Sequence, residues 1–110
     1  ELQIQGKDID LAIEHAIHMG LIVNEIVTNS IKYAFEKESQ HPTINLLLEE
    51  QNGKRTIIVS DNGRGFPEGY DPYASKRIGS KVIILLAKQI NASVDFFNQQ
   101  GAVWKFQLSS

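Results

Sequence analysis

Residues 21–35, LIVNEIVTNSIKYAF, constrain the fold of this chain more than any other stretch. A helix turns by about 100° per residue, which places Glu25, Asn29 and Lys32 on one side of this segment. Small and apolar residues fall on the opposite side, namely Ala16, Met19, Val23, Ile26, Val27, Ser30 and Ala34. A helix with one apolar side is stable when that side covers another layer of structure. We therefore predict a long helix over about residues 14–35 that packs on a sheet.

Alternation of apolar and polar residues predicts that sheet, most clearly on the two sides of Asn52-Gly53, a dipeptide typical of two-residue hairpins. Extended segments are expected over residues 2–5, 9–11, 44–50, 55–60, 93–98 and 102–108, and a second helix over residues 81–90. Tight hairpins join antiparallel strands, and two amphipathic helices need a sheet face to cover. The predicted fold class is α/β (α+β): a two-layer sandwich whose mixed, mostly antiparallel sheet is covered on one face by helices.

Length and composition narrow the possibilities further. The chain has 110 residues, a formal net charge of −2 and no cysteine. That length suits one domain with a single core. The absence of cysteine excludes disulfides, thiolate metal sites and cysteine nucleophiles, and the slightly acidic balance gives no support to nucleic-acid binding. The first residues show no signal-peptide pattern. Because the chain begins without methionine and directly in a strand-like pattern, we expect residues 1–110 to be one domain of a longer protein or a processed product.

The polar side of the long helix carries a carboxylate, an amide and an ammonium about one turn apart, at Glu25, Asn29 and Lys32. Carboxylate and amide oxygens suit a hard cation such as Mg²⁺, and a lysine suits phosphate. A solvated helix surface is the alternative interpretation. Asparagine and threonine are poorer helix formers than glutamate and lysine, so their presence at Asn24, Thr28 and Asn29 favours a site.

Two later segments also contain candidate ligand-binding residues. Residues 61–67, DNGRGFP, follow a predicted strand; they form either a surface turn or a loop in which Asp61 contacts a ligand and glycines let the backbone approach it. Gly79, Ser80 and Lys81 begin the second predicted helix, with Arg77 just before them. Free N–H groups at a helix start bind anions, although a capped helix after a polar loop explains this segment equally well.

Together these segments resemble a known family. GLIVNEIVTNSIKYAF at residues 20–35, DNGRGFP at 61–67, the polar segment 68–80 and the glycine at the second helix resemble the ATP-binding domain of sensor histidine kinases. That domain belongs to the Bergerat-fold ATPase superfamily. The resemblance covers essentially the whole chain, and its specific parts are the helix segment and DNGRGFP.

The resemblance implies Mg-ATP as the ligand and suggests roles for individual residues. Asn29 matches the magnesium-ligating asparagine. Glu25 matches a position at which a glutamate activates the attacking water in the superfamily's ATPases, whereas many sensor kinases have asparagine there. Asp61 matches the aspartate that accepts a hydrogen bond from the adenine amine. The other matched positions are Lys32 and Tyr33 for phosphate and nucleotide, Gly63 and Gly65 beside the base, and Ile78, Gly79, Ser80 and Lys81 at the second phosphate motif. Adenine also needs an apolar slot, for which Ile78 and Phe66 are the candidates. Residues from about 66 to 80 match the ATP lid.

The chain departs from the family pattern at three places. The second phosphate motif has the single glycine Gly79 where several are common, and Ala102 follows Gly101 where the family usually has threonine. Asn91-Ala92 stands where a glycine pair is frequent. These departures leave open a variant of the family with weakened ATP binding or none.

The resemblance implies a protein histidine kinase, which transfers the γ-phosphate of ATP to a histidine on the parent protein's own dimerisation domain and from there to a response regulator. The accepting histidine is expected on a separate upstream helix, which makes His15 and His18 poor candidates. A cytoplasmic domain and a homodimeric parent protein are expected, and membrane anchoring of the parent stays open. The alternatives are an anti-sigma-type serine kinase and a non-catalytic interaction module with weakened ATP binding.

Overall fold

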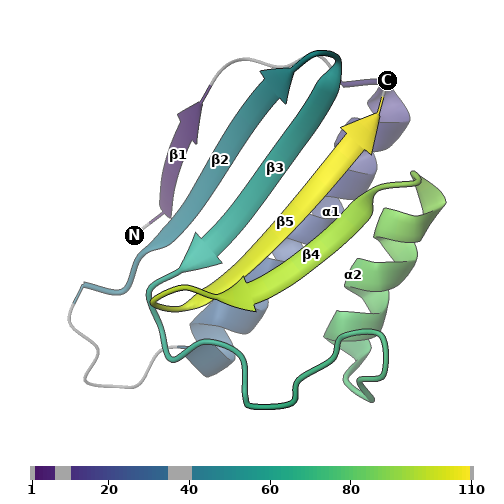
Figure 1. The fold of residues 1–110 in the computed structure, drawn as a ribbon. Coiled ribbons are helices and arrows are strands. Elements are labelled where there is room, and N and C mark those ends of the chain that lie inside the picture. Colours follow the sequence, from purple (N-terminus) through teal and green to yellow (C-terminus); the bar gives the residue numbers. More distant parts are fainter. Residues whose placement is uncertain (1, 7–10, 35–40, 110) are drawn as a thin grey trace.

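A computed structural model describes residues 2–6, 11–34 and 41–109 of the chain. Figure 1 shows the elements in chain order, with two helices behind a twisted sheet. Their bounds are β1 Leu2–Gly6, α1 Ile13–Asn29, the π-helical turn η1 Ser30–Ala34, β2 Ile44–Gln51, β3 Lys54–Asp61, α2 Ile78–Gln89, β4 Ser93–Asn98 and β5 Ala102–Ser109. Within the described ranges, neither helix is long and apolar enough to cross a membrane.

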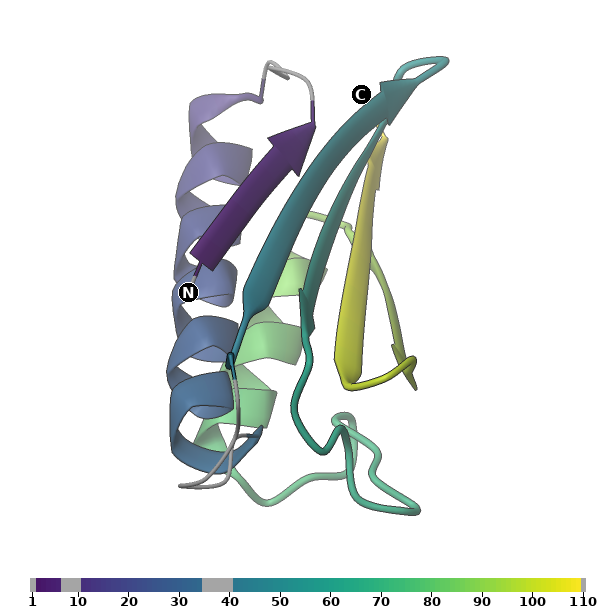
Figure 2. The same ribbon diagram turned by 90° about the vertical axis from the view of Figure 1, so that its left-hand side faces the viewer.

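The sheet has five strands in the order β1-β2-β3-β5-β4. β1 pairs with β2 in parallel, and the other three pairs are antiparallel. The hairpin between β2 and β3 turns at Asn52 and Gly53, whose φ angles of 54° and 79° are typical of a type I′ turn. Figure 2 shows both helices on one face of the sheet. The predicted two-layer sandwich with a mixed, mostly antiparallel sheet is confirmed.

The core lies between the helices and the sheet. Its fully or almost fully buried members include Met19, Ile22, Ile26, Ile57, Val59, Ile83, Ala87, Trp104, Phe106 and Leu108. Ile22 is fully buried although the helical wheel places it beside Glu25 and Asn29, because α2 packs against that side of α1. The side predicted to be polar is therefore a helix–helix contact, and Ala16, predicted to be buried, is exposed.

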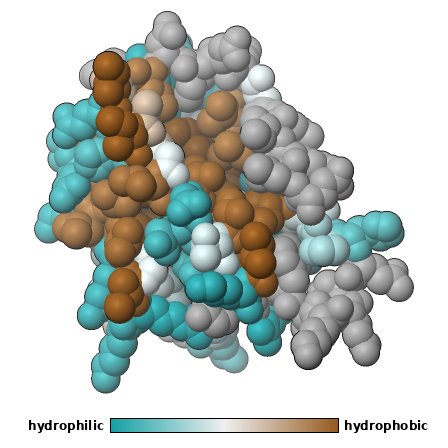
Figure 3. All heavy atoms as spheres, turned by 180° about the vertical axis from the view of Figure 1, so that it is seen from behind, coloured by the Kyte–Doolittle hydropathy of each residue, from teal (hydrophilic) through white to brown (hydrophobic). Residues whose placement is uncertain are grey.

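The outer side of the helices is partly apolar. Figure 3 shows apolar side chains over the helical face of the molecule. Ile13, Ile17 and Leu21, spaced four residues apart along α1, are between 51% and 79% exposed. On the side of α1 predicted to be buried, Met19, Ile26 and Ser30 are buried, and Val23 and Val27 pack against the core.

Several element boundaries differ from the predictions. The α-helix ends at Asn29 and continues as a π-helical turn, which has more residues per turn and so rotates Lys32 away from Glu25 and Asn29. α2 begins at Ile78 rather than at residue 81. Leu11 lies in no strand, while the rest of the extended segment expected over residues 9–11, and residue 35, lie outside the described residues.

Candidate functional site

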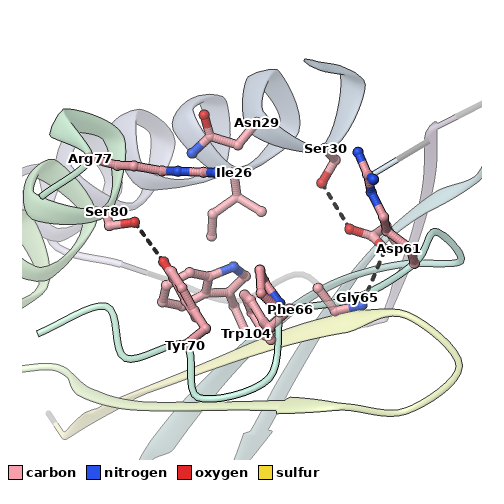
Figure 4. Close-up of a pocket in the computed structure, with 13 residues that line it drawn as sticks. Ile26, Asn29, Ser30, Asp61, Gly65, Phe66, Tyr70, Arg77, Ser80 and Trp104 are labelled. Atoms are coloured by element: carbon pink, nitrogen blue, oxygen red, sulfur yellow. Dashed lines mark hydrogen bonds between the residues drawn. The ribbon is translucent and has the colours of Figure 1, made fainter. Parts of the chain in front are cut away.

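A cavity of about 410 Å³ opens between the helix layer and the loop that follows β3. This volume is within the range of pockets for small organic ligands. Figure 4 shows its lining residues, which come from both helices, the π-helical turn, two strands and the loop. They are Ile26, Asn29, Ser30, Asp61, Arg64, Gly65, Phe66, Pro67, Tyr70, Arg77, Ser80, Ala102 and Trp104.

One end of the cavity is formed by the carboxylate of Asp61, which is only 7% exposed. Its Oδ1 atom accepts hydrogen bonds from the backbone N–H groups of Gly63 (2.9 Å) and Ala102 (3.2 Å). Its Oδ2 atom accepts one from the Ser30 hydroxyl at 3.0 Å. β5 can pass this close because position 101 is glycine: a Cβ atom there would lie 1.9 Å from the Asp61 carbonyl oxygen. The carboxylate is thus buried, oriented and hydrogen-bonded.

The walls of the cavity are apolar and aromatic. Ile26 faces it from α1, and Trp104 and Phe66 face it from the opposite side (Figure 4). The Phe66 ring stacks on Tyr70, with ring centroids 5.0 Å apart, and meets Trp104 edge-on at 5.4 Å. A flat apolar ligand group fits between such walls.

Asn98 at the end of β4 holds the loop that carries Phe66. Its Oδ1 atom accepts a hydrogen bond from the Phe66 backbone N–H at 2.8 Å, and its Nδ2 donates to the Phe66 carbonyl oxygen at 3.1 Å. Gly65 makes room for this pairing, since a Cβ atom there would lie 2.6 Å from Asn98 Oδ1. A single asparagine in a predicted strand offered no signal of this role in the sequence.

The other end of the cavity lies at the start of α2. A Cβ atom at Gly79 would lie 2.9 Å from Asn29 Nδ2 and 3.1 Å from Glu25 Oε2. Ser80, which is buried, is hydrogen-bonded with the Tyr70 hydroxyl at 2.6 Å. α2 has no side-chain cap at its N-terminus, so the N–H groups of its first turn have no partner from a capping side chain.

The structure brings together some of the residues singled out in the sequence and not others. Asn29, Asp61, Gly65 and Ser80 line the cavity, and so does Phe66. Glu25 and Gly79 lie next to Asn29, and Gly63 contacts Asp61. Lys32, Ile78 and Lys81 have exposed side chains and do not line the cavity. Ile78 is 79% exposed, so it forms no apolar wall in this structure. The side chain of Tyr33 lies outside the described residues.

Other lining residues were not singled out for the site. Ser30 was expected only on the buried side of the helix and Ala102 only as a departure from the family's threonine, because their contacts with Asp61 join residues 31 and 41 positions apart. Tyr70 lay in a polar segment with no pattern. Trp104 is 5% exposed in the core of the sheet, and it also forms a wall of the cavity.

Metal-ligand chemistry is sparse in this region. Among residues 2–6, 11–34 and 41–109, no group of three histidine, aspartate or glutamate side chains is placed to hold a metal ion. His18 is remote from the cavity, because it is hydrogen-bonded with Gln89 Oε1 at the far end of α2 (2.9 Å). Any bound cation would need ligands from a second molecule, as Mg²⁺ does when it binds together with phosphates.

Residues 14–107 match the family of histidine kinase-, DNA gyrase B- and HSP90-like ATPases. The chain belongs to this ATPase family. The resemblance seen in the sequence motifs is therefore confirmed, and with it an ATP-binding type of domain.

Individual proteins similar to this ATPase-family chain are named as protein kinases. It is 27% identical over 96 residues to blue-light-activated histidine kinase 2 of Erythrobacter litoralis, an alignment that covers 86% of this chain and 28% of that protein. The solved histidine kinase domain of the Erythrobacter litoralis EL346 kinase superposes with a TM-score of 0.85 at 25% identity, over 98% of this chain and 50% of that one. Serine-protein kinase RsbW of Staphylococcus epidermidis is 39% identical over 46 residues, or 42% of this chain and 29% of that protein.

Proposed function

We propose that this domain binds Mg-ATP in the cavity and donates the γ-phosphate to a histidine on a separate dimerisation domain of its parent protein. The observation that carries this proposal is the buried Asp61 carboxylate, oriented by three hydrogen bonds at one end of an apolar slot. Family membership and the relatives named as histidine kinases support it.

Asp61 is suited to recognise a base that carries an amino group. A carboxylate offers about four lone-pair sites, and three are taken by Ser30, Gly63 and Ala102. One acceptor site is left for a donor in the cavity, such as the exocyclic amine of adenine. The walls formed by Ile26, Phe66 and Trp104 bury the two faces of a planar ring system.

The α2 end of the cavity is suited to phosphates. Arg77 and Ser80 line it, and the N–H groups of the first turn of α2 favour an anion through the helix dipole. We place the polyphosphate here, beside Asn29. We also propose that the exposed side chains of Lys32 and Lys81 contact the phosphates from the rim of the cavity.

Asn29 and Glu25 are the proposed magnesium end of the site. Their side-chain oxygens fit a hard cation, and both lie beside position 79, where a Cβ atom would be 3.1 Å from Glu25 Oε2 and 3.3 Å from Asn29 Oδ1. When bound, a magnesium ion would offset the negative charge of the phosphates during phosphoryl transfer. In this proposal the Asn29 amide oxygen is the protein ligand, and Glu25 orients a water or the acceptor group.

The proposed lid comprises residues 66–77, because residues 78–80 of the segment first assigned to it form the first turn of α2. The remaining partners follow from the proposed activity: the parent protein's own dimerisation domain, a homodimeric parent and a response regulator, in a cytoplasmic setting. The chain spans 28% of the length of its Erythrobacter relative. We therefore propose that the phospho-acceptor domain lies in another part of the parent protein.

A serine kinase of the anti-sigma type is the second candidate function. It is favoured by the 39% identity to RsbW, which is confined to 46 residues. The two candidates share the ATP site and differ in the accepting residue. Phosphoamino-acid stability separates them, because phosphohistidine is labile to acid and phosphoserine is not.

Calorimetric titration of the 110-residue chain with ATP and MgCl₂ tests the shared proposal. We expect saturable one-to-one binding that requires Asp61 and is weakened by Asn29→Ala. Asp61→Asn keeps the shape but removes the charge, and with the amide oxygen held toward the N–H groups of Gly63 and Ala102 it replaces the Oδ2 acceptor by an NH₂ donor. Thr28→Ala is a matched control, since the Thr28 hydroxyl donates to the Asn24 carbonyl oxygen of its own helix and lies outside the cavity lining. No binding at millimolar ATP, or equal binding by all variants, would contradict the proposal and leave the non-catalytic module.

A further inference from the structure

The hydrogen bond from the Ser30 hydroxyl to Asp61 Oδ2 joins the helix layer to the sheet at the edge of the cavity. Both residues are buried, with exposures of 5% and 7%, and the donor and acceptor atoms are 3.0 Å apart. Both line the cavity, as Figure 4 shows. A hydroxyl bonded to the proposed base-recognising carboxylate is close enough to the ligand to influence it.

The two oxygens of Asp61 are held in different ways. Oδ1 is bonded by two backbone N–H groups, those of Gly63 and Ala102, which no side-chain substitution removes. Oδ2 is bonded by a side chain, that of Ser30. Since Oδ2 has the lone pair that remains for a ligand, the residue at position 30 can change recognition without dismantling the carboxylate's backbone contacts.

Ser30 is itself held in place. It is the first residue of the π-helical turn η1, and its N–H group bonds back to the carbonyl oxygens of Ile26 and Val27. A helical serine or threonine commonly bonds a carbonyl of its own helix, as Thr28 does with Asn24 at 2.8 Å. The Ser30 hydroxyl instead reaches across to the sheet, which shows that its direction is set by Asp61.

We infer that Ser30 is a positioning residue for base recognition: it acts through Asp61 to favour nucleotides whose base presents an amino group to Oδ2. The inference rests on the proposed ATP-binding function. When the hydroxyl is present, Oδ2 is pre-oriented and its remaining lone pair faces the cavity. Without it, this buried oxygen has to take up a water or turn toward another donor, and either change weakens its bond to the ligand.

The test compares two nucleotides that differ at one group. ATP carries the 6-amino group and purine riboside 5′-triphosphate lacks it, while sugar and phosphates are the same. We expect Ser30→Ala to weaken ATP binding by about fivefold, the effect of one net hydrogen bond, and to leave the affinity for the analogue unchanged. Thr28→Ala should change neither affinity.

Rescue separates a hydrogen-bonding role from simple packing. The Ala102 backbone N–H already contacts the same carboxylate at 3.2 Å, so a hydroxyl introduced by Ala102→Ser starts close to it. We expect the double variant Ser30→Ala/Ala102→Ser to recover ATP affinity. Ser30→Cys, which keeps the volume and has only a weak donor, should resemble Ser30→Ala and provides a second variant if alanine prevents folding. Circular dichroism melts establish that each variant is folded.

The possible results are distinct. If the wild-type chain binds neither nucleotide, the proposed function fails and this inference with it. If the wild type binds ATP and Asp61→Asn abolishes binding, while Ser30→Ala and Ser30→Cys retain the wild-type ratio of the two affinities, only the role of Ser30 is overturned. Equal weakening of both nucleotides, or unfolding of both Ser30 variants, would assign Ser30 a structural role and overturn the inference as well.

Discussion

Gly79 packs directly against the side chain of Asn29: a Cβ atom at position 79 would lie 2.9 Å from Asn29 Nδ2. The contact brings the start of α2 to the polar side of α1, where the proposed magnesium and phosphate groups lie. Asn29 Nδ2 and Glu25 Oε2 are the ends of side chains, so an added methyl group would displace them rather than the backbone.

The first prediction concerns this contact. Gly79→Ala should leave the free energy of unfolding unchanged or raise it by up to about 1 kcal/mol, because alanine favours a helix. It should weaken ATP binding by about tenfold, the effect of losing one hydrogen bond to a charged group, because Asn29 is displaced. Urea unfolding and calorimetry measure the two quantities. Gly20→Ala in α1 is the control: position 20 has no neighbour within 4 Å, so only stability should rise. If Gly79→Ala bound ATP as tightly as the wild type, the proposed role of Asn29 in ATP binding would be contradicted.

The second prediction concerns the hydrogen bond between Tyr70 and Ser80. Tyr70→Phe keeps the ring that stacks on Phe66 and removes the hydroxyl that lies 2.6 Å from Ser80 Oγ. We expect the free energy of unfolding to fall by about 1–2 kcal/mol, because a buried Ser80 hydroxyl loses its partner. Tyr73→Phe, at a site 62% exposed, should change stability by less than about 0.5 kcal/mol. Equal effects of the two substitutions in urea unfolding would show that the 2.6 Å contact does not stabilise the fold.

The third prediction concerns the two hydrogen bonds between Asn98 and the Phe66 backbone. Asn98→Ala should lower the free energy of unfolding by about 1–3 kcal/mol, since it leaves two backbone groups without partners. It should also weaken ATP binding, because Phe66 and Gly65 lose their anchor. Gln99→Ala, at the adjacent exposed position, is the matched control and should affect neither. A stable Asn98→Ala variant with unchanged affinity would show that the loop holds its shape by other means.

The fourth prediction contrasts two glycines with positive φ angles. Gly101 has φ of +139° and no room for a side chain, since a Cβ atom would lie 1.9 Å from the Asp61 carbonyl oxygen. Gly69 has φ of +76° and no neighbour within 4 Å. Gly69→Ala should cost about 1–2 kcal/mol of stability from backbone strain alone. Gly101→Ala should cost more than about 4 kcal/mol or prevent folding, as measured by chemical denaturation. A Gly101→Ala variant as stable as Gly69→Ala would contradict the close packing of β5 on Asp61.

Local chemistry in the sequence was enough for much of the fold. The strand–turn–strand pattern around Asn52-Gly53 predicted the β2–β3 hairpin, because that dipeptide accepts the positive φ angles that a tight hairpin needs. The predictions were less successful where a helix has apolar residues on several sides. Ile22 is fully buried and Ile17 is 57% exposed, although both are isoleucines of the same helix.

The candidate site could be predicted in part. Asn29, Asp61, Gly65 and Ser80 stood out as residue types in unusual places, and they line one cavity. Lys32 was placed with them on the assumption of a regular α-helix. The π-helical turn that begins at Ser30 changes the direction of the following residues. The pattern of apolar residues in the sequence does not predict this turn.

The sequence by itself determined the two α-helices, the hairpins and membership of the ATPase family, because these depend on local propensities and on motifs read along the chain. Only the tertiary structure decided which groups meet Asp61. The β3–β5 register brings the Ala102 N–H to Oδ1, and the packing of α1 on the sheet brings the Ser30 hydroxyl to Oδ2. Contacts between residues 31 and 41 positions apart depend on how whole layers pack, and that packing is a property of the folded chain rather than of any segment in it.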